Sequence, residues 1–155
     1  MGQYHYIVNT TKKEYLDPHC FSHGLKLLEW SQSMGGTNTA LAILLSNSNG
    51  RGGGDLYSDH PIIGTWANDN IVVAGDYAEK GDRGEPEDGY NLFARCDAGE
   101  YKNVSYLALE AMLDDSYIWE DEKRYLDERC WNEDRKKIIQ KLIKKVETRI
   151  KKERK

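Results

Sequence analysis

The chain of 155 residues has few of the residues that cross-link small folds. Its three cysteines, Cys20, Cys96 and Cys130, lie far apart, and no C-x-x-C pair is present. An odd number of cysteines at these spacings suggests neither a disulfide framework nor a zinc ribbon. A chain of this length buries enough surface to be held by its own core. We therefore expect a reduced, cytoplasmic protein.

Long apolar segments are also missing. The longest uninterrupted one covers residues 40–45, whereas a membrane-spanning helix needs roughly 20 apolar residues. The first residues show no charged stretch followed by an apolar one, which is the pattern of a secretory signal. These absences predict a protein with no membrane span.

The usual catalytic and metal-binding motifs are absent too. His19 and His23 flank Cys20, but no carboxylate stands nearby at the spacing of a metal ligand, so we predict no metal and no cofactor. The glycines near residue 50 are not followed by Lys and Ser or Thr, as they would be in a P-loop, and there is no H-E-x-x-H and no nucleophile elbow. No residue is therefore predicted to be catalytic.

Charge is distributed very unevenly along the chain. Residues 135–155 contain 11 Lys and Arg against two Glu, a net charge of +9. The whole chain has 22 basic and 26 acidic residues, so residues 1–134 hold 11 basic and 24 acidic ones, a net charge of −13. The sequence thus predicts an acidic body with a basic tail, and we favour a tail that lies on its own body.

The basic tail also has an apolar stripe. From about residue 120 onwards there is no glycine or proline, and apolar side chains recur at steps of three and four residues. The stripe consists of Ile138, Ile139, Leu142, Ile143, Val146 and Ile150. This spacing predicts a long amphipathic helix within a charged segment, residues 117–155, whose stripe must be buried.

Three surfaces are able to bury that stripe: the body, a second copy of the chain, or another protein. A protein partner or homodimer would use Ile138, Leu142, Val146 and Ile150. Nucleic acid is a less favoured partner, because aromatic side chains do not alternate with the basic ones.

Residues 1–116 have the pattern of an α+β core domain. Residues 3–9 and 13–16 are predicted to form one hairpin, and residues 62–66 and 70–74 a second one in the centre of the sheet. The fold class expected is α+β, with a small, mainly antiparallel sheet, packed helices and a long C-terminal amphipathic helix.

The helices predicted in this domain differ in how clearly the sequence defines them. Residues 37–45 are apolar almost all round, which predicts a buried helix with N-cap candidates at its start. Residues 105–115 form an amphipathic pattern with Ser105 as the cap candidate. Residues 25–30 fit either a helical turn or a buried strand, and residues 79–91 have the composition of an exposed acidic loop.

The most unusual stretch is a glycine-rich loop, residues 47–55, which carries Arg51 among four glycines. Successive glycines can turn their N–H groups towards one anion, and Arg51 can clamp that anion bidentately. Aromatic and polar side chains nearby would complete the site. The predicted ligand-binding residues are Arg51, Gly52, Gly53, Gly54, Asp55, Tyr57, His60, Trp66 and Asp76.

The first half of the chain resembles a family of uncharacterised proteins of bacteria and their phages. The likeness rests on M-G-Q-Y at 1–4, K-K-E-Y-L-D-P-H at 12–19, G-L-K-L-L-E at 24–29, N-G-R-G-G-G-D-L at 49–56, and P-I-I-G-T-W with I-V-V-A-G-D-Y within 61–77. It fades through the acidic loop and the tail. The resemblance implies no activity or ligand; it implies that the first half is the common unit and the tail an individual feature.

Three functional hypotheses follow from the sequence. The first is a non-enzymatic module that binds a phosphate-bearing small molecule, such as a nucleotide, through the Arg51 loop. The second is a protein-interaction or regulatory factor that acts through the basic C-terminal helix. The third is a hydrolase that uses His60 or His23 with Asp55 or Asp76.

Overall fold

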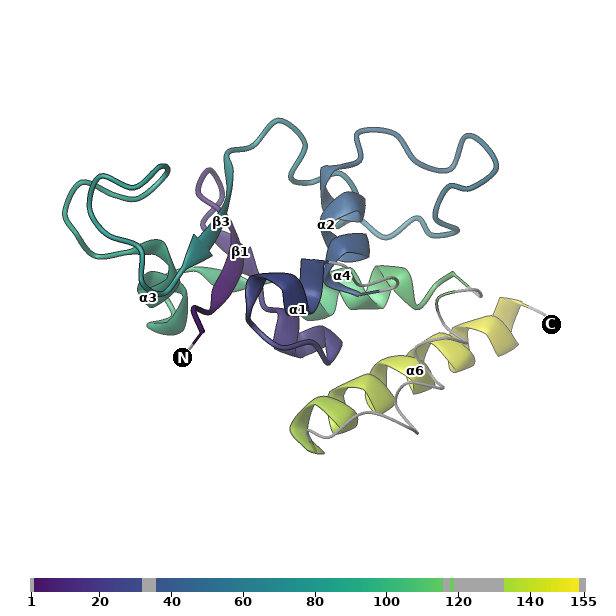
Figure 1. Cartoon of the computed structure of the whole chain (residues 1–155). Coiled ribbons are helices and arrows are strands. Elements are labelled where there is room, and N and C mark those ends of the chain that lie inside the picture. Colours follow the sequence, from purple (N-terminus) through teal and green to yellow (C-terminus); the bar gives the residue numbers. More distant parts are fainter. Residues whose placement is uncertain (1, 32–35, 116–117, 119–132, 154–155) are drawn as a thin grey trace.

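The computed structural model describes residues 2–31, 36–115, 118 and 133–153 (Figure 1). It confirms the predicted α+β class, with a sheet in the strand order β3-β1-β2-β4. The strands and short helices follow the chain as β1 (His5–Asn9), β2 (Glu14–Leu16), η1 (Pro18–Phe21), α1 (Leu27–Ser31), α2 (Thr37–Leu45), β3 (Ile71–Gly75), α3 (Leu92–Asp97), β4 (Lys102–Asn103), α4 (Ser105–Met112) and α6 (Glu133–Glu153). Three antiparallel strands and one short parallel pair make the sheet mainly antiparallel.

The first hairpin forms as predicted and supplies the central strand. β1 pairs antiparallel with β2 on one side and with β3 on the other. Its side chains are buried on both faces, because Ile7 enters one core cluster while Tyr6 and Val8 enter a second one. The Tyr6 ring stacks on Phe93 of α3 with 4.0 Å between ring centroids. β1 is therefore the strand around which the two parts of the core are built.

The prediction of a strand at residues 62–66 is wrong, and so is the central position given to the strand that follows. Residues 61–68 are a run of turns. The N–H groups of Gly64 and Trp66 donate to the carbonyls of Ile43 and Leu44, at 3.0 and 2.9 Å, so this backbone caps the end of α2. The N–H groups of Ile63, Thr65 and Ala67 bond within the turns, so the segment has none left for a ladder. Among the described residues, β3 therefore pairs only with β1, at the edge of the sheet.

The short helices cover the sheet, and two of them differ in detail from the helices predicted from the sequence. For residues 25–30 the sequence allowed either a helical turn or a strand, and the structure shows a helix that begins at Leu27. In α2 the side chains of Ala40, Ile43 and Leu44 are buried but Leu45 is exposed, so this helix is buried on one face rather than all round. Ser105 is the first helical residue of α4 instead of its cap; its hydroxyl accepts the N–H of Asp17.

The C-terminal helix α6 lies along the body (Figure 1). Ile139, Ile143 and Val146 are buried in the same cluster as α2 and α4, so the stripe packs on its own chain. Arg135 is also buried and donates from Nε to the carbonyl of Cys20 at 2.6 Å. None of the helices in the described ranges is long and apolar enough to cross a membrane.

This packing bears on the predicted partner surface. Val146 is covered by the chain's own core, Ile138 and Leu142 are half-buried, and the side chain of Ile150 lies outside the described residues. A partner helix on the stripe therefore has no support among the residues that the structure places, because part of the stripe is already occupied. Of the charged segment predicted at residues 117–155, the structure describes residue 118 and residues 133–153.

Acid is expected to destabilise the protein through His23. Burial, and then the nearby charge of Arg135, hold the pKa of this imidazole below its ordinary value of 6.5. The folded state therefore resists protonation while the unfolded state accepts it near pH 6.5, so this contribution is complete above that pH and is lost as the pH falls below it. Urea unfolding between pH 8 and pH 5 measures the loss.

The control for this prediction is His23→Gln. Glutamine keeps a polar atom for the hydroxyl of Thr37, which lies 3.1 Å from His23 Nδ1, but it does not titrate. The variant should lose stability less steeply between pH 6.5 and pH 5 than the parent. Equal slopes for the two proteins would show that His23 does not govern this pH range.

Candidate functional site

The glycine-rich loop leaves α2 and is closed at its base by one side chain. Asn49 donates from Nδ2 to the carbonyls of Leu56 and Ser58, at 2.9 and 3.3 Å, and its Oδ1 accepts the N–H of Leu56 at 2.9 Å. Gly50 and Gly54 have positive φ values of 79° and 90°, which a side chain would strain. The loop is thus a closed turn that projects from the body.

The predicted nest of N–H groups is present, but it holds an anion of its own. The carboxylate of Asp55 accepts the N–H of Arg51 at 2.8 Å and that of Gly52 at 3.2 Å. These two bonds, with a further one from Gly50, hold the pKa of Asp55 below its usual range. An external phosphate would therefore have to displace this carboxylate.

The other loop residues of the predicted site lie in the open. The side chain of Arg51 is exposed, and a Cβ built on Gly52 or Gly53 would meet nothing within 4 Å. Tyr57 is 81% exposed, and its N–H donates to the carboxylate of Asp115. The structure therefore brings Arg51, the glycines, Asp55 and Tyr57 into one projecting segment.

Trp66 and Asp76 do not belong to that segment. Trp66 is completely buried, and its Nε1 donates to Glu14 of β2 at 2.8 Å, so its ring is not available for stacking on a ligand. Asp76 directly follows β3, where its carboxylate accepts the N–H of Tyr4 at 2.9 Å. Both residues have structural contacts in place of the predicted ligand contacts.

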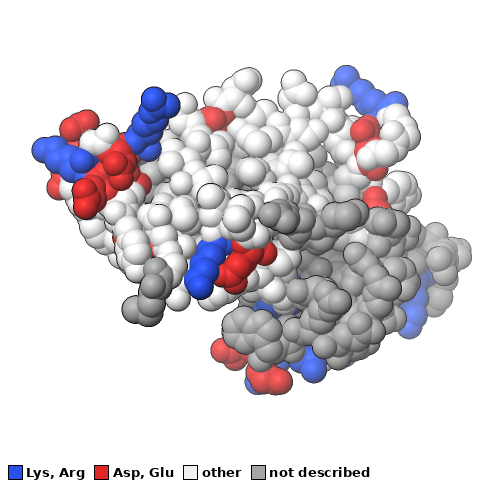
Figure 2. Space-filling view, in the orientation of Figure 1, with Lys and Arg blue, Asp and Glu red and all other residues white. Residues whose placement is uncertain are grey.

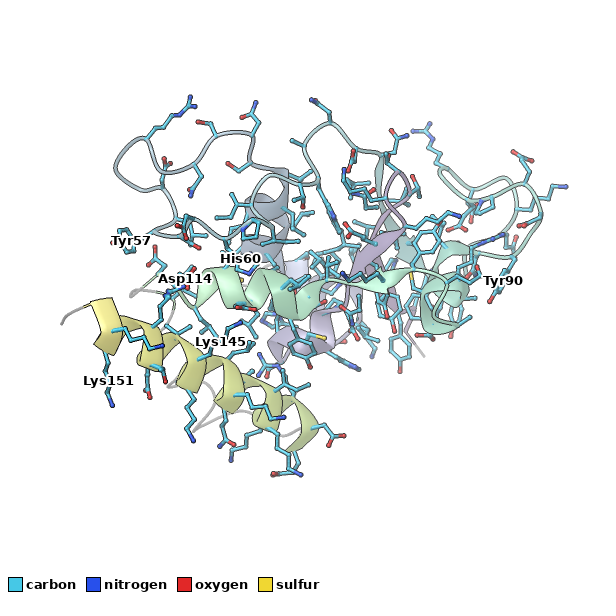
Figure 3. The ribbon with its side chains drawn as sticks, turned by 180° about the vertical axis from the view of Figure 1, so that it is seen from behind. Tyr57, His60, Tyr90, Asp114, Lys145 and Lys151 are labelled. Atoms are coloured by element: carbon cyan, nitrogen blue, oxygen red, sulfur yellow. The ribbon has the colours of Figure 1, made fainter. Side chains whose placement is uncertain are left out.

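A polar cluster that the sequence did not reveal joins α4, α6 and the segment after the loop (Figure 3). Ser58 donates to Asp114 at 2.5 Å, and Arg149 of α6 pairs with the same carboxylate. One helical turn away, Lys145 donates to Glu110 at 2.7 Å. Lys145 and Arg149 are four apart, which places them on one face of α6, whereas Glu110 lies in α4 and Asp114 lies in the turn that follows α4.

His60 completes this cluster without forming a catalytic dyad. Its Nδ1 accepts the N–H of Ile62 at 3.1 Å, and its Nε2 lies 3.9 Å from Glu110. Ser58 donates to Asp114 and not to the imidazole. The cluster therefore holds α6 on the body, and no nucleophile and base are paired in it.

The open surface of α6 is its basic face, which we define as Lys137, Lys141, Lys144, Lys151 and Lys152. All five side chains are exposed, on the side of the helix opposite Ile139 and Val146. Figure 3 shows Lys151 pointing away from the body, whereas Lys145 points towards it. A shallow groove of about 480 Å³ lies between this face and the two body-paired residues, lined by Lys141, Lys144, Lys145, Thr148, Arg149 and Lys152.

The surface elsewhere carries charges of both signs. In Figure 2, Lys or Arg lies beside Asp or Glu at both ends of the visible face, where the loop around residues 79–91 and the glycine-rich loop project. One such pair, Arg95 with Asp88, is 2.5 Å apart. The basic face of α6 differs because its lysines have no acidic partner among the described residues.

Neither a metal-binding group among the described residues nor a similar known protein indicates the function of this chain. The described residues contain no group of three or more His, Cys, Asp or Glu that could hold a metal ion. No family model, curated protein or solved structure matches the chain.

Proposed function

We propose that this protein is a non-enzymatic interaction factor that docks on an acidic protein surface through the basic face of α6. The observation that carries the proposal is that the side chains of α6 fall into two sets, one in contact with the body and one exposed. Ile139, Ile143 and Val146 pack on the body, and Lys145 and Arg149 are engaged in ion pairs there. The five lysines of the basic face remain to attract an anionic partner.

Three features favour a protein partner over nucleic acid. Both arginines of the described helix contact the body: Arg135 donates to the carbonyl of Cys20, and Arg149 pairs with Asp114. The guanidinium groups, which are suited to bidentate binding of phosphate, are therefore not on the basic face. The face carries no aromatic side chain for stacking on bases. A long polyanion would also extend past this helix, roughly 31 Å in length, towards a body of net charge −13.

The test uses poly-L-glutamate as an acidic probe. The triple variant Lys141→Glu, Lys144→Glu, Lys152→Glu should bind it about tenfold or more weakly than the parent, since each exposed pair contributes about 0.2–1 kcal/mol and reversal adds repulsion. Fluorescence anisotropy at low ionic strength measures the affinity. The parent affinity should also fall as salt is added, because exposed charges are screened.

The matched control reverses three exposed lysines of the body. The variant Lys26→Glu, Lys80→Glu, Lys102→Glu has the same net charge as the first variant but an intact basic face. It should keep most of the affinity. Equal losses in the two variants would mean that net charge, and not the basic face, governs binding. Tighter binding to duplex DNA than to poly-L-glutamate at equal charge would replace the protein partner by a nucleic acid.

A second candidate is the phosphate-bearing ligand at the glycine-rich loop. The observation in its favour is that two N–H groups of the loop already bind a carboxylate, that of Asp55, so they are oriented for an anion. Arg51 stands beside them with its side chain in solvent. In this proposal the ligand displaces the carboxylate of Asp55 from these N–H groups, and Arg51 supplies the positive charge that backbone N–H groups lack.

Removal of Asp55 tests the second candidate. In Asp55→Ala the N–H groups are free, so inorganic phosphate or a nucleotide should raise the melting temperature more than it does for the parent. A ligand present at 100 times its Kd stabilises by about 2.7 kcal/mol. Adding Arg51→Ala to Asp55→Ala should abolish the shift. If Asp55→Ala responds to neither compound, the loop is not an anion site.

A further inference from the structure

A cavity of about 470 Å³ lies between α2 and the chain that follows this helix. The opposite wall from α2 includes Leu56 and Ile63, which are half-buried and pack against the main core cluster. The volume falls within the roughly 300–1,000 Å³ of sites that bind small molecules. The wall on the side of α2 is one face of the helix and its end, because its residues are three or four apart: Thr39, Ala42, Ile43 and Ser46.

Hydrogen bonds to the backbone fix the two walls relative to each other. The N–H of Gly64, which follows Ile63, donates to the carbonyl of Ile43 at 3.0 Å. Asn49 binds both the N–H and the carbonyl of Leu56, each at 2.9 Å, so the backbone of Leu56 is held at the base of the loop. A ligand therefore meets apolar walls that are already in place, and its binding does not bear the cost of ordering a loop.

The charged groups of this cavity have one sign. Its described lining contains Asp55 and Asp115 but no Lys or Arg. The side chain of Arg51 is exposed and is not part of the lining. The hydrogen bonds from the loop N–H groups hold the pKa of Asp55 below its usual range, so this carboxylate is ionised at neutral pH. The cavity thus combines aliphatic walls with a negatively charged rim.

We propose that this cavity binds a small amphipathic amine, whose apolar group packs between Ile43, Leu56 and Ile63 while its protonated amino group lies at the rim beside Asp55. Such a cation complements the carboxylates of the rim, whereas an anion of the same shape is repelled by them. Because Asp55 is exposed, the amino group keeps part of its water and the desolvation cost stays small. An amine requires the carboxylate of Asp55, whereas a phosphate at the loop has to displace it.

Three probes that share a phenyl ring and differ in charge test the proposal: phenethylamine, phenethyl alcohol and hydrocinnamate. NMR titration of the full chain near neutral pH measures their affinities from the amide shifts of Ala42, Leu56 and Ile63. The protonated amine should bind about threefold or more tightly than the neutral alcohol, which is the range for exposed ion pairs, and the anion should bind most weakly. Binding of none of the probes, or an amine that binds no more tightly than the other two, would overturn the proposal.

Three variants locate the binding of phenethylamine. Ala42→Phe introduces a ring into the cavity from an exposed position on α2 and should abolish binding. Ala98→Phe, the matched control, makes the same change at an exposed position that does not line the cavity, and should bind as the parent does.

The third variant, Asp55→Asn, keeps an oxygen for the N–H groups of Arg51 and Gly52 but removes the charge. It should bind the amine about two- to fivefold more weakly and the alcohol as the parent does. Amine binding that survives Ala42→Phe, or that is unchanged in Asp55→Asn, would contradict the proposed site.

Discussion

Replacing Trp66 with alanine should destabilise the protein by about 3–5 kcal/mol, which is the range for deletion of a buried aromatic ring. Trp66 is fully buried in the cluster that also contains Ile7, Leu44 and Ile139. The substitution leaves a cavity within this cluster. It also removes the partner of Glu14, whose carboxylate accepts the indole N–H. A loss of this size is a large share of the 5–15 kcal/mol by which domains are usually stable.

Urea unfolding followed by circular dichroism measures this loss. Tyr57→Ala is the matched control, because it deletes an aromatic ring that is 81% exposed and should change stability by no more than about 0.5 kcal/mol. If Trp66→Ala lost no more than Tyr57→Ala, the segment 61–68 would not be anchored in the core as described.

A carboxylate at position 139 should release α6 from the body. Ile139 is completely buried, in contact with the cluster formed by α2 and α4. Burying an unpaired charge costs several kcal/mol, and the apolar contacts of isoleucine are lost in addition. We expect Ile139→Asp to lower the free energy of unfolding by about 4 kcal/mol or more.

The comparison variant for this prediction is Lys141→Asp. It introduces the same carboxylate two residues away, on the basic face, and should leave stability nearly unchanged. Urea unfolding of the two variants, with the helical signal of each in the absence of urea, separates the two faces of α6. Similar stabilities for Ile139→Asp and Lys141→Asp would contradict the packing of the stripe on the body.

Local patterns predicted most of the regular structure. The hairpin of β1 and β2 follows from short runs of Tyr, Ile and Val between turn residues, and α6 follows from apolar residues at steps of three and four. The prediction of a strand at residues 62–66 failed, although I-I-G-T-W has the composition of a strand. Which backbone its N–H groups would meet is decided by the end of α2, and a local pattern contains no information on that contact.

The candidate site was less predictable than the fold. The glycines of residues 47–55 correctly indicate a loop that can gather N–H groups around an anion. That the anion is Asp55 depends on loop geometry, which permissive glycines leave open. The ion pairs of α6 had a signal, since Glu110 and Asp114 are four apart, as are Lys145 and Arg149. Composition does not show that these two helical segments face each other.

The most direct test of the proposed docking surface is NMR chemical-shift mapping with poly-L-glutamate. The account predicts that the perturbed amides lie along α6, centred on Lys141, Lys144 and Lys152, and that the perturbations disappear in the variant that reverses those three lysines. Amides of the glycine-rich loop should be unaffected. Perturbations centred on residues 47–60, or none on α6, would contradict a docking role for the basic face.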